Sequence, residues 1–352
     1  MRRLVGILTG AFGLAAAYLL FWPVAVDPVP FHPPPNPGMA GAFAPNRALT
    51  SAEKVAPGIG PGPEDVTRGP DGMFYTGLED GRVVRFREDG TLPETWVNTG
   101  GRPLGMQFDS DGNLIVADAF RGLLSISPGR ETRVLTDRAG GRRLLFPNDL
   151  DIASDGSIWF TDASQRFDQH HWILDFLETR GTGSLLRYDR KTGATEVRLS
   201  GLLFANGVAV GPNDEFVLVN ETLAARITRL WLRGSRAGKQ ESFLTLPAYP
   251  DNLSYNGRGV FWVALAVPRD EILERSWEYV FPRKVMARLP RRLIEGQSRR
   301  YSWVVGVDAA GRIVSNLQDP GGWGSVTSVN EFDGKLYLGS IATDFVGRYT
   351  LR

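Results

Sequence analysis

The chain has 352 residues, and its 42% apolar content together with 41 Gly and 23 Pro indicates a globular, turn-rich protein with a large core. It contains no Cys and only three His, which excludes disulfides, thiolate zinc sites, iron–sulfur clusters and cysteine nucleophiles, so any metal site must use oxygen ligands. The 40 basic and 39 acidic residues leave a net charge of +1, which argues against nucleic acid as a partner.

The first 22 residues have the pattern of a transmembrane anchor. Residues 4–22 carry no charge and follow Arg2 and Arg3, close to the ~20 apolar residues that span a bilayer. The positive-inside rule then places the rest of the chain on the extracytoplasmic side, periplasmic or luminal. A cleaved signal peptide is the alternative, because residues 15–17 resemble a cleavage site. Residues 23–47 follow as a proline-rich spacer, expected to hold the folded part off the membrane.

Residues 48–352 repeat a turn followed by an alternating strand about every forty residues. A second hairpin lies between successive turns, so each unit holds four short strands. Six such units predict an all-β, six-bladed β-propeller, with residues 48–55 completing the last blade. A β-sandwich or a solenoid is the alternative. The turns lie at residues 71–72, 111–112, 155–156, 213–214, 258–259 and 333–334.

Two of the intervals between successive turns are longer than the repeat of about forty residues, and each of them contains a helix-like insertion. Residues 164–183 place Trp172 and Phe176 at helical spacing. The apolar residues of 269–295, among them Leu273, are also spaced as in a helix. We expect both insertions to form lids over the mouth of the propeller channel. They either line a substrate entrance, rest on a membrane, or pack on the propeller, and their amphipathic pattern favours the last interpretation.

Residues eight positions before the turns define one register of the repeat. Because this position begins the innermost strand of each blade, its side chains can converge on the channel axis. Two carboxylates and two amides there favour calcium over magnesium. For each residue alone, a turn-forming Asn or Asp is the alternative. Four of the six positions carry oxygen ligands, namely Glu64, Asn148, Asn206 and Asp251.

The next position in the register carries a second set of polar residues. It holds Asp65, Asp149 and Asn252. Since side chains alternate along a strand, Asp65 and Asp149 are expected to point away from the first set, toward a possible second, structural cation.

Five motifs resemble the strictosidine-synthase-like branch of the six-bladed calcium propellers, whose relatives are the paraoxonases, the senescence-marker and gluconolactonase proteins and the membrane-anchored adipocyte proteins. They are Gly62-Pro-Glu-Asp-Val66, Phe146-Pro-Asn-Asp-Leu150, Phe204-Ala-Asn-Gly-Val208, Val219-Asn-Glu-Thr222 and Tyr249-Pro-Asp-Asn-Leu253. The resemblance runs from Ser51 to the C-terminus. It implies lactonase or arylesterase activity and a structural calcium near Asp65 and Asp149. The catalytic calcium that it implies is held by Glu64, Asn148, Asn206, Asp251 and Asn252.

The chain also departs from these relatives. Paraoxonases carry a histidine pair over the catalytic calcium, and the matching positions here are Leu104 and Asp118. The glutamate that strictosidine synthases use for condensation falls at Thr327. Neither a histidine relay nor a condensing activity is therefore expected.

Calcium-dependent hydrolysis of a small ester or lactone is the leading functional hypothesis. The cation would polarise the carbonyl while a carboxylate activates water. Asp251 is the first candidate for that base, and Asp118 is the second, although a loop aspartate is more often a turn-former. The alternative is a membrane-anchored, calcium-stabilised binding module without catalysis.

Overall fold

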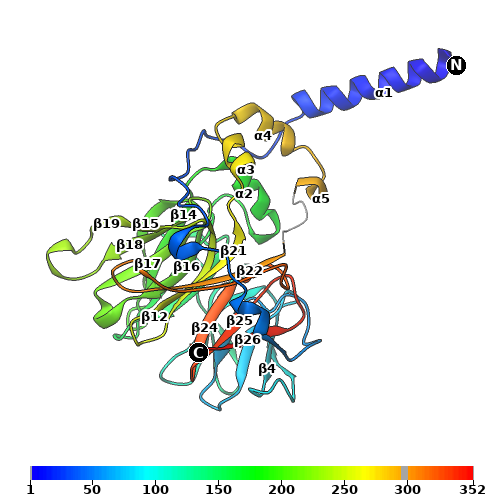
Figure 1. Ribbon diagram of the computed structural model, residues 1–352. Helices are drawn as coiled ribbons and strands as arrows, with labels where there is room; N and C mark the ends of the chain where they lie inside the picture. Colours follow the sequence, from blue (N-terminus) through cyan, green and yellow to red (C-terminus); the bar gives the residue numbers. More distant parts are fainter. Residues whose placement is uncertain (1, 295–299, 352) are drawn as a thin grey trace.

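The computed structural model describes residues 2–294 and 300–351 and contains six four-stranded antiparallel sheets (Figure 1). The first strands of the sheets contact one another in sequence order, and the last of them contacts the first. This closed ring confirms the predicted six-bladed all-β propeller. Blades 1 to 3 consist of β2 Val66–Arg68, β3 Phe74–Gly77, β4 Arg82–Phe86 and β5 Glu94–Asn98; β6 Pro103–Phe108, β7 Leu114–Asp118, β8 Gly122–Ile126 and β9 Thr132–Thr136; β12 Pro147–Ile152, β13 Ile158–Asp162, β14 Gly183–Tyr188 and β15 Thr195–Leu202.

Blades 4 to 6 follow the same order from the channel outward, and a separate short hairpin, β10 Arg138–Ala139 with β11 Arg142–Arg143, follows blade 2 in the chain. Their strands are β16 Ala205–Val210, β17 Phe216–Glu221, β18 Arg226–Trp231 and β19 Gln240–Thr245; β20 Ala248–Tyr255, β21 Phe261–Pro268, β22 Tyr301–Val307 and β23 Ile313–Pro320; β24 Ser328–Phe332, β25 Lys335–Gly339, β26 Val346–Thr350 and β1 Glu53–Val55.

Blade 6 is closed by a strand from the opposite end of the chain. In β1, Glu53 pairs with Arg348 and Val55 with Val346, antiparallel to β26. The predicted closing segment is therefore confirmed, but only its last three residues are a strand, because Ala48–Ser51 forms the 3₁₀ helix η2. Leu49 of η2 is fully buried among residues of blades 5 and 6, which fixes the segment across the closure.

The strands change from apolar to polar between the channel and the rim, as expected for sheets stacked face to face around an axis. All residues of β16 and β17 are buried, whereas the outer strand β15 is mostly exposed, with only Leu199 and Leu202 buried. The predicted turns depend on glycine where the backbone is left-handed, with φ of 78° at Gly72 and 80° at Gly112. Side chains of adjacent blades therefore form the core, and the turns lie outside it.

Both predicted insertions are helical. The first contains η3 Gln169–His171 and α2 Trp172–Glu178, and the second contains α3 Glu271–Ser276, α4 Val280–Met286 and α5 Arg291–Ile294; residue 295 lies outside the described residues. These lids gather at one end of the propeller (Figure 1). Trp277 is 1% exposed and packs in one apolar cluster with Tyr249 and Phe204, which begin inner strands. We call this the lid end of the channel and the opposite one the far end.

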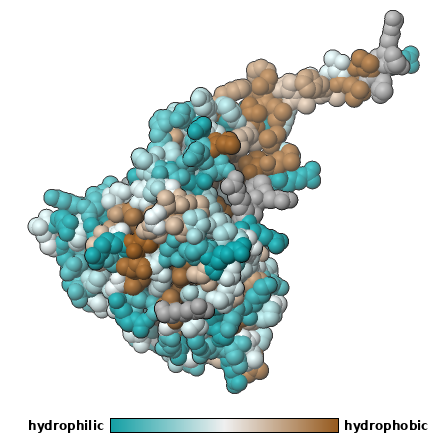
Figure 2. All heavy atoms as spheres, viewed as in Figure 1, coloured by the Kyte–Doolittle hydropathy of each residue, from teal (hydrophilic) through white to brown (hydrophobic). Residues whose placement is uncertain are grey.

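The N-terminal helix α1, Arg2–Phe21, projects from the body of the molecule, and several of its apolar side chains are exposed (Figures 1 and 2). Within residues 2–294 and 300–351, no helix is both long and apolar enough to cross a membrane, so the predicted transmembrane helix at residues 1–22 is not supported.

Residues 23–47, predicted as a proline-rich spacer, form a segment that we call the strap. Apart from the 3₁₀ helix η1, Gly41–Phe43, the strap has no regular structure, but its backbone bonds to both lids. Val29 N donates to Glu178 O at 3.0 Å, and Phe31 N donates to Trp277 O at 3.1 Å. An extended segment leaves its backbone groups free, and here the lids supply the partners. The strap therefore holds the lids against the propeller.

Candidate functional site

The predicted ligand positions lie in β-bulges. Pairing of β12 with β13 skips from Pro147 to Leu150, and pairing of β16 with β17 skips from Ala205 to Val208. The inner strands of blades 2 and 5 skip in the same way. A bulge releases residues from the ladder and redirects their side chains. The released pairs are Leu104-Gly105, Asn148-Asp149, Asn206-Gly207 and Asp251-Asn252.

Four of the predicted ligands have a side-chain oxygen that is buried and has no hydrogen-bond partner. They are Glu64 Oε2, Asn148 Oδ1, Asn206 Oδ1 and Asn252 Oδ1. The amide nitrogens are used instead: Asn252 Nδ2 donates to Glu64 Oε1 at 3.0 Å, and Asn206 Nδ2 donates to Thr222 Oγ1 at 3.2 Å. A buried acceptor without a partner costs about 1–3 kcal/mol. Several such acceptors in neighbouring strands are an arrangement that an electropositive ligand would satisfy.

Burial and the charge of a neighbouring carboxylate change the pKa values of the carboxylates in this set. Burial raises the pKa of Glu64 well above its usual value, and the nearby charge of Asp251 raises it further. Burial also raises the pKa of Asp251 to about 7, against a lowering hydrogen bond from Asn206. Glu64, Asn206 and Asp251, from blades 1, 4 and 5, therefore meet at the channel. Asp251 is the one of these three that is not fully buried.

The donor set fits calcium. In the described part of the chain, no group of three or more His, Cys, Asp or Glu side chains is placed to hold a metal. Glu64 and Asp251 are instead joined by amide oxygens, a mixture that calcium accepts and that most transition metals do not. The unpartnered oxygens of Asn148 and Asn206 are the ligand atoms that such a site requires.

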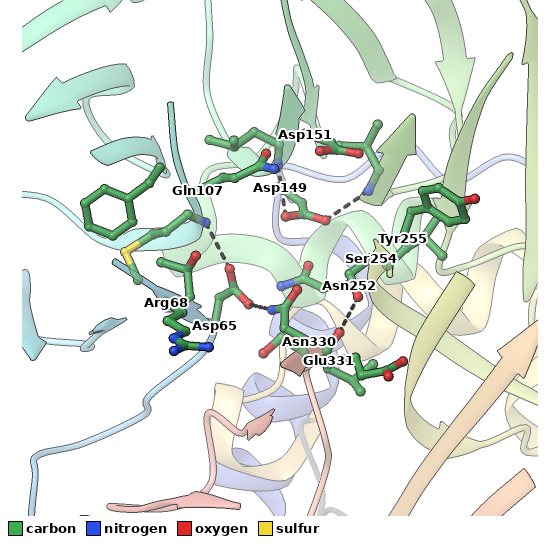
Figure 3. Close-up of a pocket in the computed structure, with 18 of the residues that line it drawn as sticks. Asp65, Arg68, Gln107, Asp149, Asp151, Asn252, Ser254, Tyr255, Asn330 and Glu331 are labelled. Carbon is green, nitrogen blue, oxygen red and sulfur yellow. Dashed lines mark hydrogen bonds between the residues drawn. The ribbon is translucent and has the colours of Figure 1, made fainter. Parts of the chain in front are cut away.

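Asp65 and Asp149 lie on the other side of these residues, where they line a cavity at the far end (Figure 3). Each carboxylate is fully hydrogen-bonded. Asp65 accepts from Met106 N at 3.0 Å and Asn330 Nδ2 at 2.8 Å. Asp149 accepts from Leu150 N and Val208 N, both at 2.9 Å. They connect inner strands of neighbouring blades, a role that the sequence pattern did not indicate.

Asp118 has the contacts of a turn-former. It is fully buried, and its Oδ1 accepts from the backbone N–H groups of Arg102 at 3.1 Å and Phe120 at 3.0 Å. At the same place in blade 3, Asp162 Oδ1 accepts from Phe146 N at 2.7 Å. Since the contact is repeated between blades, it belongs to the blade architecture. The geometry therefore favours Asp251 over Asp118 as the base.

Two residues near the site were missed by the sequence reasoning. Arg102 is 2% exposed and donates to Gly62 O at 3.0 Å, and its positive charge lowers the pKa of Glu64. Asn220 Nδ2 donates to Asp251 O at 2.6 Å and so fixes the backbone of that bulge. Asn220 stands in one of the five family motifs, which was a usable signal, whereas nothing in the sequence marked Arg102 as buried.

Comparison with known proteins identifies the class. A family model described as strictosidine synthase matches residues 148–235, and one described as strictosidine synthase-like, N-terminal, matches residues 41–86. Protein STRICTOSIDINE SYNTHASE-LIKE 4 of Arabidopsis thaliana is 36% identical over 313 residues, which cover 87% of this chain and 84% of that protein. The chain therefore belongs to the strictosidine synthase-like family, as its motifs predicted.

Two further comparisons place it within this group. The adipocyte plasma membrane-associated protein of Homo sapiens is 34% identical over 368 residues, covering 96% of this chain and 86% of that protein. Among solved structures, a gluconolactonase from Xanthomonas campestris superposes with a TM-score of 0.63 at 18% identity, over 94% of this chain and 99% of the other. The similarity to the gluconolactonase structure shows that the two proteins share a fold.

Proposed function

We propose that this protein is a calcium-dependent hydrolase of small esters or lactones. The observation that carries the proposal is the set of buried, unpartnered oxygens on Glu64, Asn148 and Asn206 beside the partly exposed Asp251. The fold shared with a gluconolactonase supports the reaction class. Calcium would be held by Glu64, Asn148, Asn206, Asp251 and Asn252. When bound, it would polarise the substrate carbonyl and stabilise the negative charge on its oxygen.

Asp251 acts as the base. Its carboxylate orients the attacking water and accepts its proton, and the hydrogen bond from Asn206 holds the carboxylate in place. Asn220 fixes the backbone carbonyl of the same residue. Neither His nor Cys takes part, consistent with the composition of the chain.

The lid end favours an apolar substrate. Phe146, Phe204 and Tyr249 lie two residues before Asn148, Asn206 and Asp251 and pack with Trp277 of the second lid. These side chains exclude water from the place where the ester carbonyl would lie. A closed, apolar mouth is more typical of an enzyme than of a flat binding face, so we place the non-catalytic binding module second.

The test compares Asp251→Asn with Asp162→Asn, a buried carboxylate outside the site. Hydrolysis of phenyl acetate and of δ-lactones is measured with calcium and with a chelator. We expect Asp251→Asn and chelation each to lower kcat/KM by about 10²-fold or more, the usual contribution of a general base, and Asp162→Asn to leave it near the wild-type value. Unchanged hydrolysis after chelation and in Asp251→Asn would refute the proposal.

We also propose that the protein associates with membranes through α1. The helix exposes large apolar side chains, including Phe12 at 77% and Phe21 at 80%. A relative with 34% identity is named a plasma membrane-associated protein. The full chain should sediment with phosphatidylcholine vesicles, and a chain that starts at Pro23 should not. Equal sedimentation of both would show that α1 is not the attachment.

A further inference from the structure

The second lid carries apolar side chains that the propeller does not cover. Trp277 and Leu273 pack on the mouth of the channel. Tyr279, Phe281 and Leu293 of the same lid are exposed, with Phe281 at 58%. Exposed aromatic and leucine side chains gathered in one short segment are typical of a surface that meets a partner. The proposed hydrolysis does not use these side chains.

The same lid is strongly basic. Residues 280–294 hold five basic residues and no acidic one, although the whole chain has a net charge of only +1. Arg283 is buried and bonds to the first lid and the strap. The other four are partly or fully exposed, namely Lys284, Arg288, Arg291 and Arg292. Such a concentration of positive charge attracts a negatively charged surface.

The acidic residues around this surface do not cancel its charge, because each of them has a partner of its own. The pairs are Glu271 with Arg275 at 3.6 Å, Glu278 with His32 at 3.3 Å, and Asp27 with Arg180 at 2.8 Å. Asp27 also lies 3.7 Å from Lys284. The exposed arginines of residues 280–294 therefore remain available to an anionic partner.

The second lid lies against the end of α1 that joins the body of the molecule. Arg288 Nε donates to Trp22 O at 2.6 Å, and Tyr18 Oη donates to Arg288 O at 3.2 Å. Arg291 Nη1 donates to His170 O of the first lid at 2.7 Å. Figure 2 shows the apolar residues of α1 continuing onto the lids at this junction. A membrane that binds α1 would therefore also meet the second lid.

The combination of side chains favours a bilayer over a second copy of the chain. Aromatic and leucine side chains enter the boundary between headgroups and acyl chains, and basic side chains beside them bind anionic headgroups. Two copies of the same basic surface would repel each other. The continuity with α1, which we propose to attach to membranes, points to the same partner.

We propose that the second lid docks on the surface of an anionic bilayer. Tyr279, Phe281 and Leu293 enter the headgroup region, and Lys284 and Arg292 bind lipid phosphates. The docking extends the proposed membrane association beyond α1, and it requires no hydrolysis. The mouth of the channel under this lid then lies at the bilayer, where an apolar ester dissolves; this consequence rests on the proposed function.

The test measures sedimentation of the full chain with phosphatidylcholine vesicles, with and without phosphatidylserine. We expect phosphatidylserine to strengthen binding and added salt to remove the gain. Arg292→Glu should weaken binding to the mixed vesicles at least about fivefold, the usual contribution of one basic residue near an anionic surface, and should leave binding to pure phosphatidylcholine at the wild-type value. The matched control is Arg87→Glu, at an exposed far-end turn between β4 and β5.

A second variant tests the apolar contact. Phe281→Ser should weaken binding to the mixed vesicles about tenfold, because a phenyl ring that leaves water contributes that much or more. Leu92→Ser is the control, since Leu92 is 59% exposed in the same far-end turn as Arg87. Both lid substitutions replace exposed side chains, and thermal unfolding of each variant verifies that it is folded.

Three outcomes would overturn the proposal. The first is equal binding of the wild-type chain to vesicles with and without phosphatidylserine. The second is equal weakening by Arg292→Glu and Arg87→Glu, which would mean that only net charge matters. The third is a dimer without lipid that Phe281→Ser dissociates, which would assign the surface to a second copy. Binding to pure phosphatidylcholine reports on α1, and hydrolysis is measured without vesicles, so failure here is distinct from failure of the proposed function.

Discussion

At the lid end of the channel, Asn148 and Asn206 hold carbonyl oxygens that no protein group approaches, whereas at the far end Asp65 and Asp149 have both carboxylate oxygens hydrogen-bonded. The lid end is covered by the lids and the strap, and the far end opens into a cavity. The lid end therefore keeps acceptors for a ligand, while the far end uses them to connect blades.

The contrast is sharpest between two consecutive residues. Asn148 and Asp149 are released by the same bulge of β12, and the two residues differ in the direction in which their side chains point. Asn148 Oδ1 has no partner, but Asp149 accepts two backbone N–H groups, one of them from blade 4. A bulge thus lets one strand supply a functional residue and a structural residue side by side.

The largest effect is expected from replacing these neighbours separately. Asp149→Leu removes two hydrogen bonds and leaves two buried backbone N–H groups without a partner, each at a cost of about 1–3 kcal/mol, and should lower the free energy of unfolding by about 3 kcal/mol. Asn148→Leu removes an oxygen without a partner and should change it by about 1 kcal/mol or less without calcium. Urea denaturation in chelator measures both, and equal losses would contradict the assignment of roles to the two ends.

A smaller effect is expected at the contact that closes the lid end. Arg283 of α4 is fully buried and donates to Leu177 O at 3.0 Å, to Thr179 Oγ1 at 2.6 Å and to Val29 O of the strap at 2.7 Å. Arg283→Met should cost about 2–3 kcal/mol of local stability. Limited proteolysis should then cut the strap at least tenfold faster, with no change at far-end loops.

The control is Arg275→Met, because Arg275 lies on α3 with its side chain 79% exposed. It should leave the cleavage rate at the wild-type value. If both variants are cut equally, or if far-end loops are cut as fast as the strap, then the lids are not held by Arg283 and the two ends open together.

The parts of the fold that were predictable are those with a local signal. The Asp-Gly turn at residues 71–72 recurs because a left-handed glycine is needed there, and the apolar strand after it, β3, is buried on both faces. Repetition of this unit was enough to predict six blades and the register of Glu64, Asn148, Asn206 and Asp251. The insertions were found because they interrupt the period.

The remaining features depend on backbone groups, which carry no signal of their own in the sequence. Bulges shift pairing by one residue, and only the pairing partner reveals them. The prolines of the strap exclude regular structure, but its contacts with the lids were not predictable, because its partners are the carbonyls of Glu178 and Trp277, which any residue would supply. The partners of Asp118 Oδ1 are likewise backbone N–H groups, which the sequence does not mark.

The smallest effect concerns Asp175 of α2 in the first lid, a carboxylate that is 1% exposed and has no partner for either oxygen. Burial raises its pKa from 3.8 to about 7. The folded protein therefore holds this proton more tightly than the unfolded chain does. The contribution of Asp175 to stability is complete below about pH 4 and is lost as the pH rises toward about 7.

At 1.36 kcal/mol per pH unit, this loss amounts to about 2 kcal/mol between pH 5 and pH 7. Asp175→Asn has no proton to lose, so its free energy of unfolding relative to the wild type should increase by that amount over the interval. Urea denaturation at the two pH values measures the difference, with Asp308→Asn, in the partly exposed turn between β22 and β23, as the control. A constant difference would mean that Asp175 is paired in solution and that its buried carboxylate does not carry the raised pKa.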